Sequence, residues 1–152
     1  MVKHWIAHRG NLKGPNPERE NHPDYIMEAI GADYDVEIDV WFLKGHLYLG
    51  HDVPQYLIPL DFLKHPRLWC HAKNLEALTF MLENSIRCFS HDKDNYVIVS
   101  DGSIFALPGK QLNYRTICVM PEWSDYDLRE LKGCLGICSD IVGEYREKIE
   151  VL

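Results

Sequence analysis

The chain alternates short apolar runs, rich in Val, Ile, Tyr and Trp, with segments in which apolar residues recur every three or four positions. The first pattern is typical of buried strands and the second of helices with one buried face. We expect strands over residues 4–8, 34–42, 46–51, 67–72, 86–90, 96–100, 103–107, 115–120 and 135–139. We expect helices over residues 23–30, 60–64, 75–84 and 125–132, and a last helix from about residue 142.

Residues with strong positional preferences mark the ends of these elements. Pro23 suits the first turn of a helix, and Gly31 suits the position just beyond its last turn. Asn74 and Ser124 have side chains that cap helix N-termini. Asp101-Gly102 favours a type I′ turn, which would join the flanking strands into a hairpin. In the helix after Asn74, the apolar spacing predicts a buried face made of Leu75, Leu78, Met81 and Leu82.

Repeated strand–helix units predict a mostly parallel sheet that is covered by helices. The number of strand candidates, with helices between most of them, favours a closed barrel over an open sheet. An ordinary (β/α)₈ barrel needs about 200 residues or more, whereas this chain has 152. The expected fold class is therefore α/β, a reduced TIM-type (β/α) barrel. It would occupy residues 1–152 as a single domain and lack a helix at the hairpin.

The segment from Ala32 to Val40 has an unusual distribution of charge. Alternate residues of a strand point to opposite faces of the sheet. One face of this strand is apolar, and the other carries four acids, Asp33, Asp35, Glu37 and Asp39. In a barrel the acidic face points inward, where several like charges are costly without a cation. A half-exposed strand with a solvated acidic face is the alternative.

Neighbouring predicted strands also end in polar groups, which are His8 and Arg9, His51 and Asp52, His71 and Lys73, and Ser139 and Asp140. Catalytic groups of α/β barrels gather at the C-terminal ends of the strands. Glu37 and Asp39 could both reach one hard cation such as Mg²⁺ or Ca²⁺. Such an ion polarises a phosphoryl oxygen, and His8 and His51 would then supply the base and the acid.

The composition narrows the classes of partner. The formal net charge is −7 without a basic stripe, so nucleic-acid binding is not expected. Five cysteines without a C-x-x-C pair favour buried free thiols in a reducing compartment. No apolar run approaches about 18 residues, and the N-terminus does not resemble a signal peptide. These features predict a cytoplasmic protein without a membrane span.

Five short motifs resemble, in order, those of the glycerophosphodiester phosphodiesterase family, whose barrel belongs to the phospholipase C-like phosphodiesterase superfamily. They are Ile6-Ala-His-Arg-Gly10, Arg19-Glu-Asn-His-Pro23, Glu37-Ile-Asp-Val40, Gly50-His-Asp52 and Gly136-Ile-Cys-Ser-Asp140. The first, third and fourth resemble the family's opening His-Arg-Gly, its metal-binding Glu-x-Asp and its second catalytic His-Asp. One of these motifs alone is weak, whereas the ordered set, spread from residue 6 to residue 140, is specific.

This resemblance implies that Glu37 and Asp39 bind the metal and that His8 and His51 form the acid–base pair. It also implies that Arg9 contacts the phosphate and that Glu20 lies near the metal or the phosphate. In that family the substrate's own neighbouring hydroxyl can attack phosphorus, which gives a cyclic phosphate that water then opens.

The chain departs from the family pattern in three places. Where the family's next strand usually ends in Glu-x-Lys, this chain has His71-Ala-Lys73, and Lys73 still fits a phosphate contact. His71 either binds the metal, which shifts the preference towards Mn²⁺ or Zn²⁺, or only hydrogen-bonds the phosphate. The family's long insertion after the His-Asp motif is absent. Asp35 is an additional inward acid, which we expect to pair with a cation on a neighbouring strand, with Lys3 as a candidate.

The expected function is hydrolysis of a small glycerophosphodiester-type substrate with one divalent metal ion, Mg²⁺ or Ca²⁺, with Mn²⁺ as an alternative. Trp123 is expected to line the substrate pocket, and Asp140 either orients a site group or caps the last helix. Two alternatives stay open. One is a catalytically silent relative with a binding or regulatory role. The other is a lyase-type relative that stops at the cyclic phosphate, as the spider-venom phospholipase D enzymes of this superfamily do.

Overall fold

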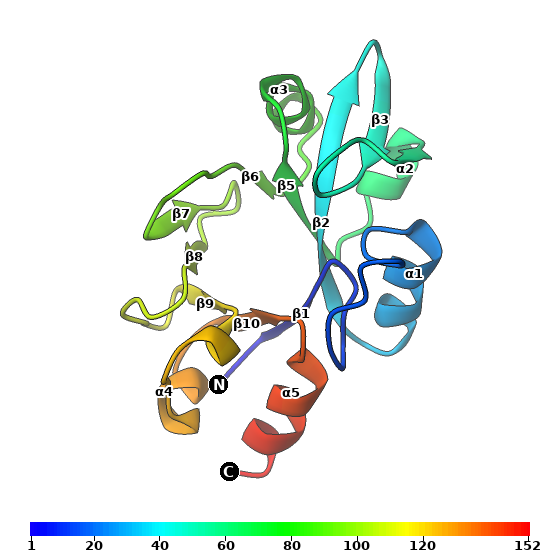
Figure 1. Cartoon of the computed structure of the whole chain (residues 1–152). Helices are drawn as coiled ribbons and strands as arrows, with labels where there is room; N and C mark the ends of the chain where they lie inside the picture. Colours follow the sequence, from blue (N-terminus) through cyan, green and yellow to red (C-terminus); the bar gives the residue numbers. More distant parts are fainter.

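The computed structural model describes all 152 residues and combines a ten-stranded sheet with five α-helices and one 3₁₀ helix (Figure 1). This agrees with the predicted α/β class. The elements are β1 (His4–His8), α1 (Pro23–Gly31), β2 (Asp35–Leu43), β3 (His46–Leu49), β4 (Tyr56–Ile58), α2 (Leu60–Leu63), β5 (Leu68–Ala72), α3 (Leu75–Glu83), β6 (Cys88–Phe89), β7 (Tyr96–Ile98), β8 (Ile104–Ala106), β9 (Thr116–Val119), η1 (Pro121–Trp123), α4 (Leu128–Lys132), β10 (Gly136–Ser139) and α5 (Val142–Glu150).

The centre of the sheet is parallel, in the order β6-β5-β2-β1-β10-β9-β8. Strands β3 and β4 extend the far end of β2 in antiparallel fashion, and β7 pairs antiparallel with β8. Strand β4 was not predicted from the sequence, because the flanking Pro54 and Pro59 are typical of a connecting loop. Since the central strands run in one direction, their C-terminal ends lie along one edge, where ligands of α/β sheets bind.

The two faces of the sheet carry separate apolar clusters. Val36, Ile38 and Val40 of β2 belong to the larger cluster, which α1 and α3 help to cover. Side chains alternate along a strand, so Glu37 and Asp39 share the opposite face. The smaller cluster on that face consists of Ile6, Trp69, Phe89, Val97, Val99, Phe105, Ile117 and Cys138.

The α3 helix begins as predicted but buries a different face. Asn74 caps α3 as expected, because its side chain accepts a hydrogen bond from the Ala77 amide. Leu75 and Leu82 are nevertheless 72% and 54% exposed, since α3 buries the side that carries Ala77 and Met81. The predicted inward positions of these two leucines were therefore wrong.

The cap of α4 was also predicted wrongly. The side chain of Asp127 accepts hydrogen bonds from the amides of Arg129 and Glu130. Ser124 instead ends the 3₁₀ turn formed by residues 121–123. That turn delays the start of α4 to Leu128.

Two turns also differ from expectation. The connection between β7 and β8 consists of the five residues 99–103 and is closed by a 2.9 Å hydrogen bond from Val99 N–H to the Ser103 carbonyl. Only Gly102 has a positive φ there (89°), whereas a type I′ turn needs positive φ at both central residues. Gly31 is the last residue of α1, and Asp33, with φ of 72°, turns the chain into β2.

No helix is long and apolar enough to cross a membrane, and the longest have nine residues. All five cysteines are free and buried, as predicted. Burial raises the pKa of each thiol, which keeps these side chains protonated and poorly reactive.

Gly136 allows β10 to approach β1 closely. A Cβ atom there would lie 2.9 Å from both the Cβ and the carbonyl oxygen of His4. We expect Gly136→Ala to lower the free energy of unfolding by about 1–3 kcal/mol, the usual cost of overpacking, as measured by urea denaturation. Gly31→Ala is the control, because a Cβ there meets nothing within 4 Å and alanine favours helix. Equal losses in the two variants would contradict this account.

Candidate metal-binding and catalytic site

The three acids of β2 lie at alternate positions in the first half of the strand. Asp35 lies at its start and Glu37 and Asp39 lie further along, with exposures of 7%, 4% and 1%. Asp33 lies before the strand and is exposed, so the prediction that it points inward was wrong. Each of the three buried carboxylates requires groups that compensate its charge.

Asp35 is neutralised by partners other than Lys3. Its carboxylate accepts hydrogen bonds from Arg67 Nε and Trp69 Nε1, each at 2.9 Å, and lies 3.1 Å from His4 Nδ1. Burial raises the pKa of Asp35, but the hydrogen bonds with His4, Trp69 and Arg67 outweigh burial, so the net pKa is lowered. Asp35 thus pairs with a cation from a neighbouring strand segment, as predicted, but that cation is Arg67, directly before β5, and not Lys3. This acid is satisfied within the protein.

Strand register brings the other predicted residues together. In the parallel pairing of β1 with β2, His8 lies opposite Glu37. In the pairing of β2 with β5, Asp39 lies opposite His71. Strand β3 ends at Leu49, so His51 lies in the turn that follows it and not within the strand as predicted.

Asp39 is held by a two-point contact with Asn21. The Asp39 amide donates to Asn21 Oδ1 and Asn21 Nδ2 donates to Asp39 Oδ2, both at 2.9 Å. His71 Nδ1 lies 3.1 Å from Asp39 Oδ1, and Arg9 Nε lies 3.5 Å from Asp39 Oδ2. Burial raises the pKa of Asp39, but the His71 and Asn21 hydrogen bonds and the Arg9 charge outweigh it and lower this pKa to about 2. Asp39 is therefore ionised near neutral pH.

Glu37 lacks such support. Its Oε1 atom is buried without a hydrogen-bond partner. The nearest cationic groups are His8 Nε2, 3.8 Å from Oε1, and His71 Nδ1, 4.0 Å from Oε2. Burial and then the negative charge of Asp39 raise the pKa of Glu37. A buried acceptor of this kind beside a second carboxylate calls for a cation.

The residues around Glu37 fit a divalent metal ion. One ligand atom from each of Glu37, Asp39 and His71 lies within 4.8 Å of the others. Two carboxylates and an imidazole form a mixed oxygen–nitrogen donor set, which suits Mn²⁺ or Zn²⁺ better than a set of oxygens alone. The unpartnered Oε1 of Glu37 would gain a partner when such an ion binds.

His8 is oriented by Asp140. Its Nδ1 atom is hydrogen-bonded to Asp140 Oδ1 at 2.8 Å, which leaves Nε2 on the side of Glu37. Asn11 Nδ2 also donates to Asp140 Oδ1, at 2.9 Å. Burial lowers the pKa of His8, but the Asp140 hydrogen bond and the charge of Glu37 more than offset it, so the net pKa is raised. Of its two predicted roles, Asp140 thus has the orienting one, since no side chain caps α5.

Glu20 acts through Arg9 and Asn11. Its carboxylate accepts hydrogen bonds from Arg9 Nη1 (3.2 Å), Asn11 Nδ2 (3.1 Å) and the Asn16 amide (2.7 Å). It is not part of the three-residue ligand cluster. Arg9 has a positive φ of 56°, and its Nε atom is buried without a hydrogen bond.

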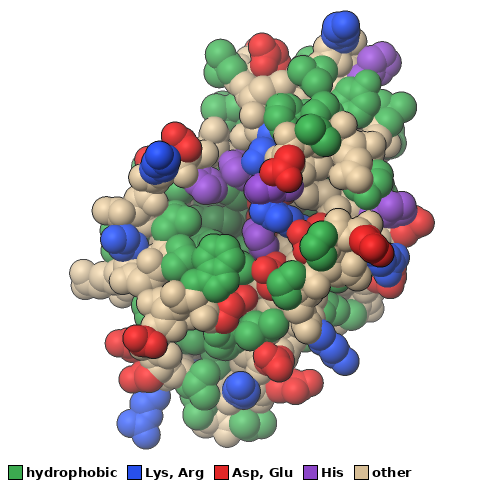
Figure 2. Space-filling model, in the orientation of Figure 1, with side chains coloured by type: hydrophobic (Ala, Val, Ile, Leu, Met, Phe, Trp, Pro, Cys, Tyr) green, Lys and Arg blue, Asp and Glu red, His purple; other side chains and the backbone are tan.

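A cavity of about 180 Å³ opens over these groups, and Figure 2 shows histidine and basic side chains around a hollow bordered by hydrophobic ones. Its lining includes seven predicted site residues, His8, Arg9, Glu37, Asp39, His51, His71 and Trp123. Lys73 and Glu20 do not line it. His51 is 43% exposed, and its Nδ1 atom is hydrogen-bonded to Asp52 Oδ1 at 2.8 Å.

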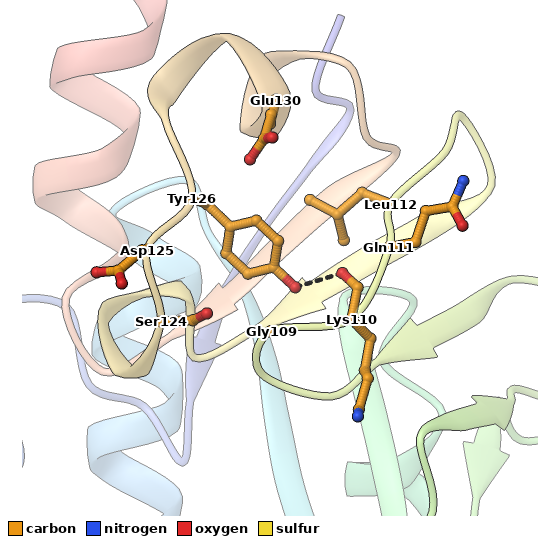
Figure 3. A pocket seen from close by; sticks show the side chains of 8 residues that line it. All are labelled: Gly109, Lys110, Gln111, Leu112, Ser124, Asp125, Tyr126 and Glu130. Carbon is orange, nitrogen blue, oxygen red and sulfur yellow. Dashed lines mark hydrogen bonds between the residues drawn. The ribbon is translucent and has the colours of Figure 1, made fainter.

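A larger cavity, of about 540 Å³, lies elsewhere and is shown in Figure 3. Tyr126 crosses it, with its hydroxyl donating to the Lys110 carbonyl. None of the predicted site residues lines it, and it has no histidine or cluster of metal ligands. The smaller cavity therefore carries the candidate chemistry.

Comparison with protein-family models, curated proteins and solved structures found no match for this chain. The sequence reading named the catalytic and metal candidates but gave no role to Asn11 or Asn21. Both are fully buried asparagines in the loop before α1. Asn21 lies in the motif of residues 19–23, which could have indicated it, whereas only the uncommon burial of a polar residue distinguishes Asn11. Burial in a loop cannot be predicted from periodicity.

The contact between Asp140 and His8 predicts a measurable change in titration. We expect Asp140→Asn to lower the pKa of His8, because burial then acts with less opposing negative charge. The imidazole resonances of His8, followed by NMR across pH, report this pKa. Asp52→Asn is the matched control, since Asp52 pairs with His51. An unchanged pKa of His8 in Asp140→Asn would contradict the assigned contact.

The raised pKa of Glu37 predicts an effect on stability. Its proton is bound more tightly in the folded chain than in the unfolded chain, so ionising Glu37 at neutral pH reduces stability. We expect Glu37→Gln to raise the free energy of unfolding of the metal-free protein at pH 7 by on the order of 1 kcal/mol. Glu83→Gln, on the exposed side of α3, should change it little. Destabilisation by Glu37→Gln without metal would show that Glu37 has a partner.

Proposed function

We propose that this chain is a metal-dependent phosphodiesterase that acts on small glycerophosphodiester-type substrates and belongs to the glycerophosphodiester phosphodiesterase family. The proposed architecture is a reduced TIM-type barrel. It is supported by the parallel central strands and by the apolar cluster on the face away from the helices. A 2.9 Å hydrogen bond from the Ser100 amide to the Cys88 carbonyl also links β6 to the turn after β7, at opposite ends of the sheet order.

The observation that carries the proposed function is the pairing of a buried acid cluster with two His–Asp pairs in one cavity. The Nδ1 atoms of His8 and His51 are each hydrogen-bonded to an aspartate carboxylate at 2.8 Å, which leaves the Nε2 atoms available to the substrate. Glu37, with its unpartnered oxygen, lies beside His8. A cluster of acids with only a structural role would not require two oriented imidazoles beside it.

The metal would be held by Glu37, Asp39 and His71, the three residues whose ligand atoms cluster. When bound, a divalent cation attracts the phosphate and polarises a phosphoryl oxygen. The negative charge of the site would otherwise repel the substrate, since Asp39 is ionised. Arg9, on the same cavity, would hold a second phosphate oxygen.

The two imidazoles would move the protons of the reaction. One accepts the proton of the attacking hydroxyl at Nε2 as the new P–O bond forms, and the other donates a proton to the departing alkoxide as the old bond breaks. Asp140 and Asp52 fix the imidazole planes and leave Nε2 of each ring free for these transfers. A neighbouring hydroxyl of the substrate would give a cyclic phosphate, and water would give the hydrolysed monoester.

One observation favours a second candidate, a catalytically silent barrel with a binding role. His71 Nδ1 is already hydrogen-bonded to the Asp39 carboxylate, and Arg9 Nε lies 3.5 Å from the same carboxylate. Arg9 and the hydrogen bond with His71 could thus stabilise the charge of Asp39 without a metal. Glu37 would still lack a partner for Oε1, which is why the enzyme is the proposal preferred here.

Activity measurements with glycerophosphocholine, glycerophosphoethanolamine and an activated aryl diester test the proposal, with Mg²⁺, Ca²⁺, Mn²⁺ or EDTA. We expect turnover that requires metal and falls by about 10²–10⁴-fold in His8→Ala and in His51→Ala, the usual range for lost acid–base catalysis. His46→Ala, an exposed histidine of β3, is the control. Turnover that survives EDTA or His8→Ala would refute the mechanism. ³¹P NMR of the product separates hydrolysis from cyclic-phosphate release.

A further inference from the structure

The cavity that holds the acids has a second, apolar part. Seven hydrophobic side chains contribute to its lining, namely Phe89, Phe105, Leu107, Val119, Met120, Trp123 and Cys138. They come from β6, β8, β9, β10 and the segments that follow β8 and β9. Five of them come from β8, β9 and the segments that follow these strands, which β1 and β10 separate from β2 in the sheet order, so the cavity has an ionic side and an apolar side.

Most side chains of this apolar part are buried and closely packed. The rings of Phe89 and Phe105 pack with centroids 4.5 Å apart, and both side chains are 3% exposed. Met120 is 1% exposed, whereas Trp123 is 69% exposed. The buried members are part of the protein's interior, and Trp123 offers an accessible aromatic surface at the same cavity.

The apolar side of the cavity is poorly suited to recognising a polyol. The fourteen residues around the cavity include no Ser, Thr, Tyr, Asn, Gln or Lys. The hydroxyl groups of a glycerol or sugar placed against the apolar side would find no side-chain hydroxyl or amide there. A buried hydroxyl without a partner costs roughly 1–3 kcal/mol, whereas each buried CH₂ group contributes about 0.8 kcal/mol.

Given the phosphodiesterase site proposed above, we propose that the apolar side binds a small apolar alcohol group of the diester, comparable to butyl or phenyl. The volume of about 180 Å³ is below the roughly 300 Å³ of pockets for drug-sized ligands, so a long acyl chain does not fit inside. The phosphate lies on the ionic side, and the alkyl or aryl group lies against Phe105, Leu107 and Val119.

Two diesters of glycerol 3-phosphate test this selectivity. One carries a butyl group and the other a second glyceryl group, so both release a primary alcohol and differ in polarity. We expect kcat/KM to be at least about 10-fold higher for the butyl diester, in line with burial of several methylene groups. Equal values, or a preference for the glyceryl diester, would overturn the inference. A choline diester preferred over its neutral 3,3-dimethylbutyl analogue would also overturn it, in favour of cation recognition by the aromatic rings.

Variants of the apolar side link any preference to these residues. Val119→Thr keeps the shape and adds a hydroxyl, and Leu107→Gln adds an amide, so each should reduce the butyl preference several-fold and raise kcat/KM for the glyceryl diester. Ile98→Gln is the matched control, because Ile98 is 78% exposed and is not among the residues around the cavity. A preference that persists in both lining variants would place the butyl group elsewhere.

Binding measurements separate failure of this inference from failure of the proposed function. If no diester is turned over, the phosphodiesterase proposal fails, and the pocket is still tested by isothermal titration with butyl phosphate and glycerol 3-phosphate. Tighter binding of butyl phosphate, weakened in Val119→Thr, supports the apolar pocket. Equal or weaker binding than glycerol 3-phosphate contradicts it.

Discussion

The burial of two carboxylates side by side on β2 is the constraint on which the rest of the site depends. Glu37 and Asp39 are 4% and 1% exposed, and two such charges inside a protein are costly unless other groups compensate. The compensation is uneven. Asp39 is satisfied by Asn21 and His71, whereas Glu37 keeps an oxygen without a partner. This asymmetry is the basis of the proposed cation site.

Contacts with these charged groups determine the conformation of the loop before α1. Arg9 and Asn21 both adopt positive φ values, 56° and 66°, which asparagine tolerates but which are unfavourable for a residue such as arginine. Glu20 ties this loop together through Arg9 and Asn11. Local backbone strain is thus exchanged for charge neutralisation and for the orientation of His8, through the link from Asn11 to Asp140.

Much of the architecture follows from alternation in the sequence. The apolar and acidic residues of β2 take opposite faces because a strand alternates strictly, so the positions of Glu37 and Asp39 were predictable. The partners of Asp35 were not, because Arg67 and His4 are distant in sequence and their proximity depends on strand order. Helix faces were less certain than strand faces: Leu75 and Leu82 fit a helical stripe in sequence, yet α3 buries its smaller Ala77 side.

Anomalous scattering from a crystal soaked in Mn²⁺ is the most direct test of the central claim. The account predicts a single strong anomalous peak bounded by Glu37, Asp39 and His71, with Glu37 Oε1 in its coordination shell, and loss of this peak in Glu37→Gln. A structure at the same Mn²⁺ concentration with no peak among these residues, and with His71 still hydrogen-bonded to Asp39, would contradict it. In that case the acids would be neutralised internally, and the metal-dependent site would have to be abandoned.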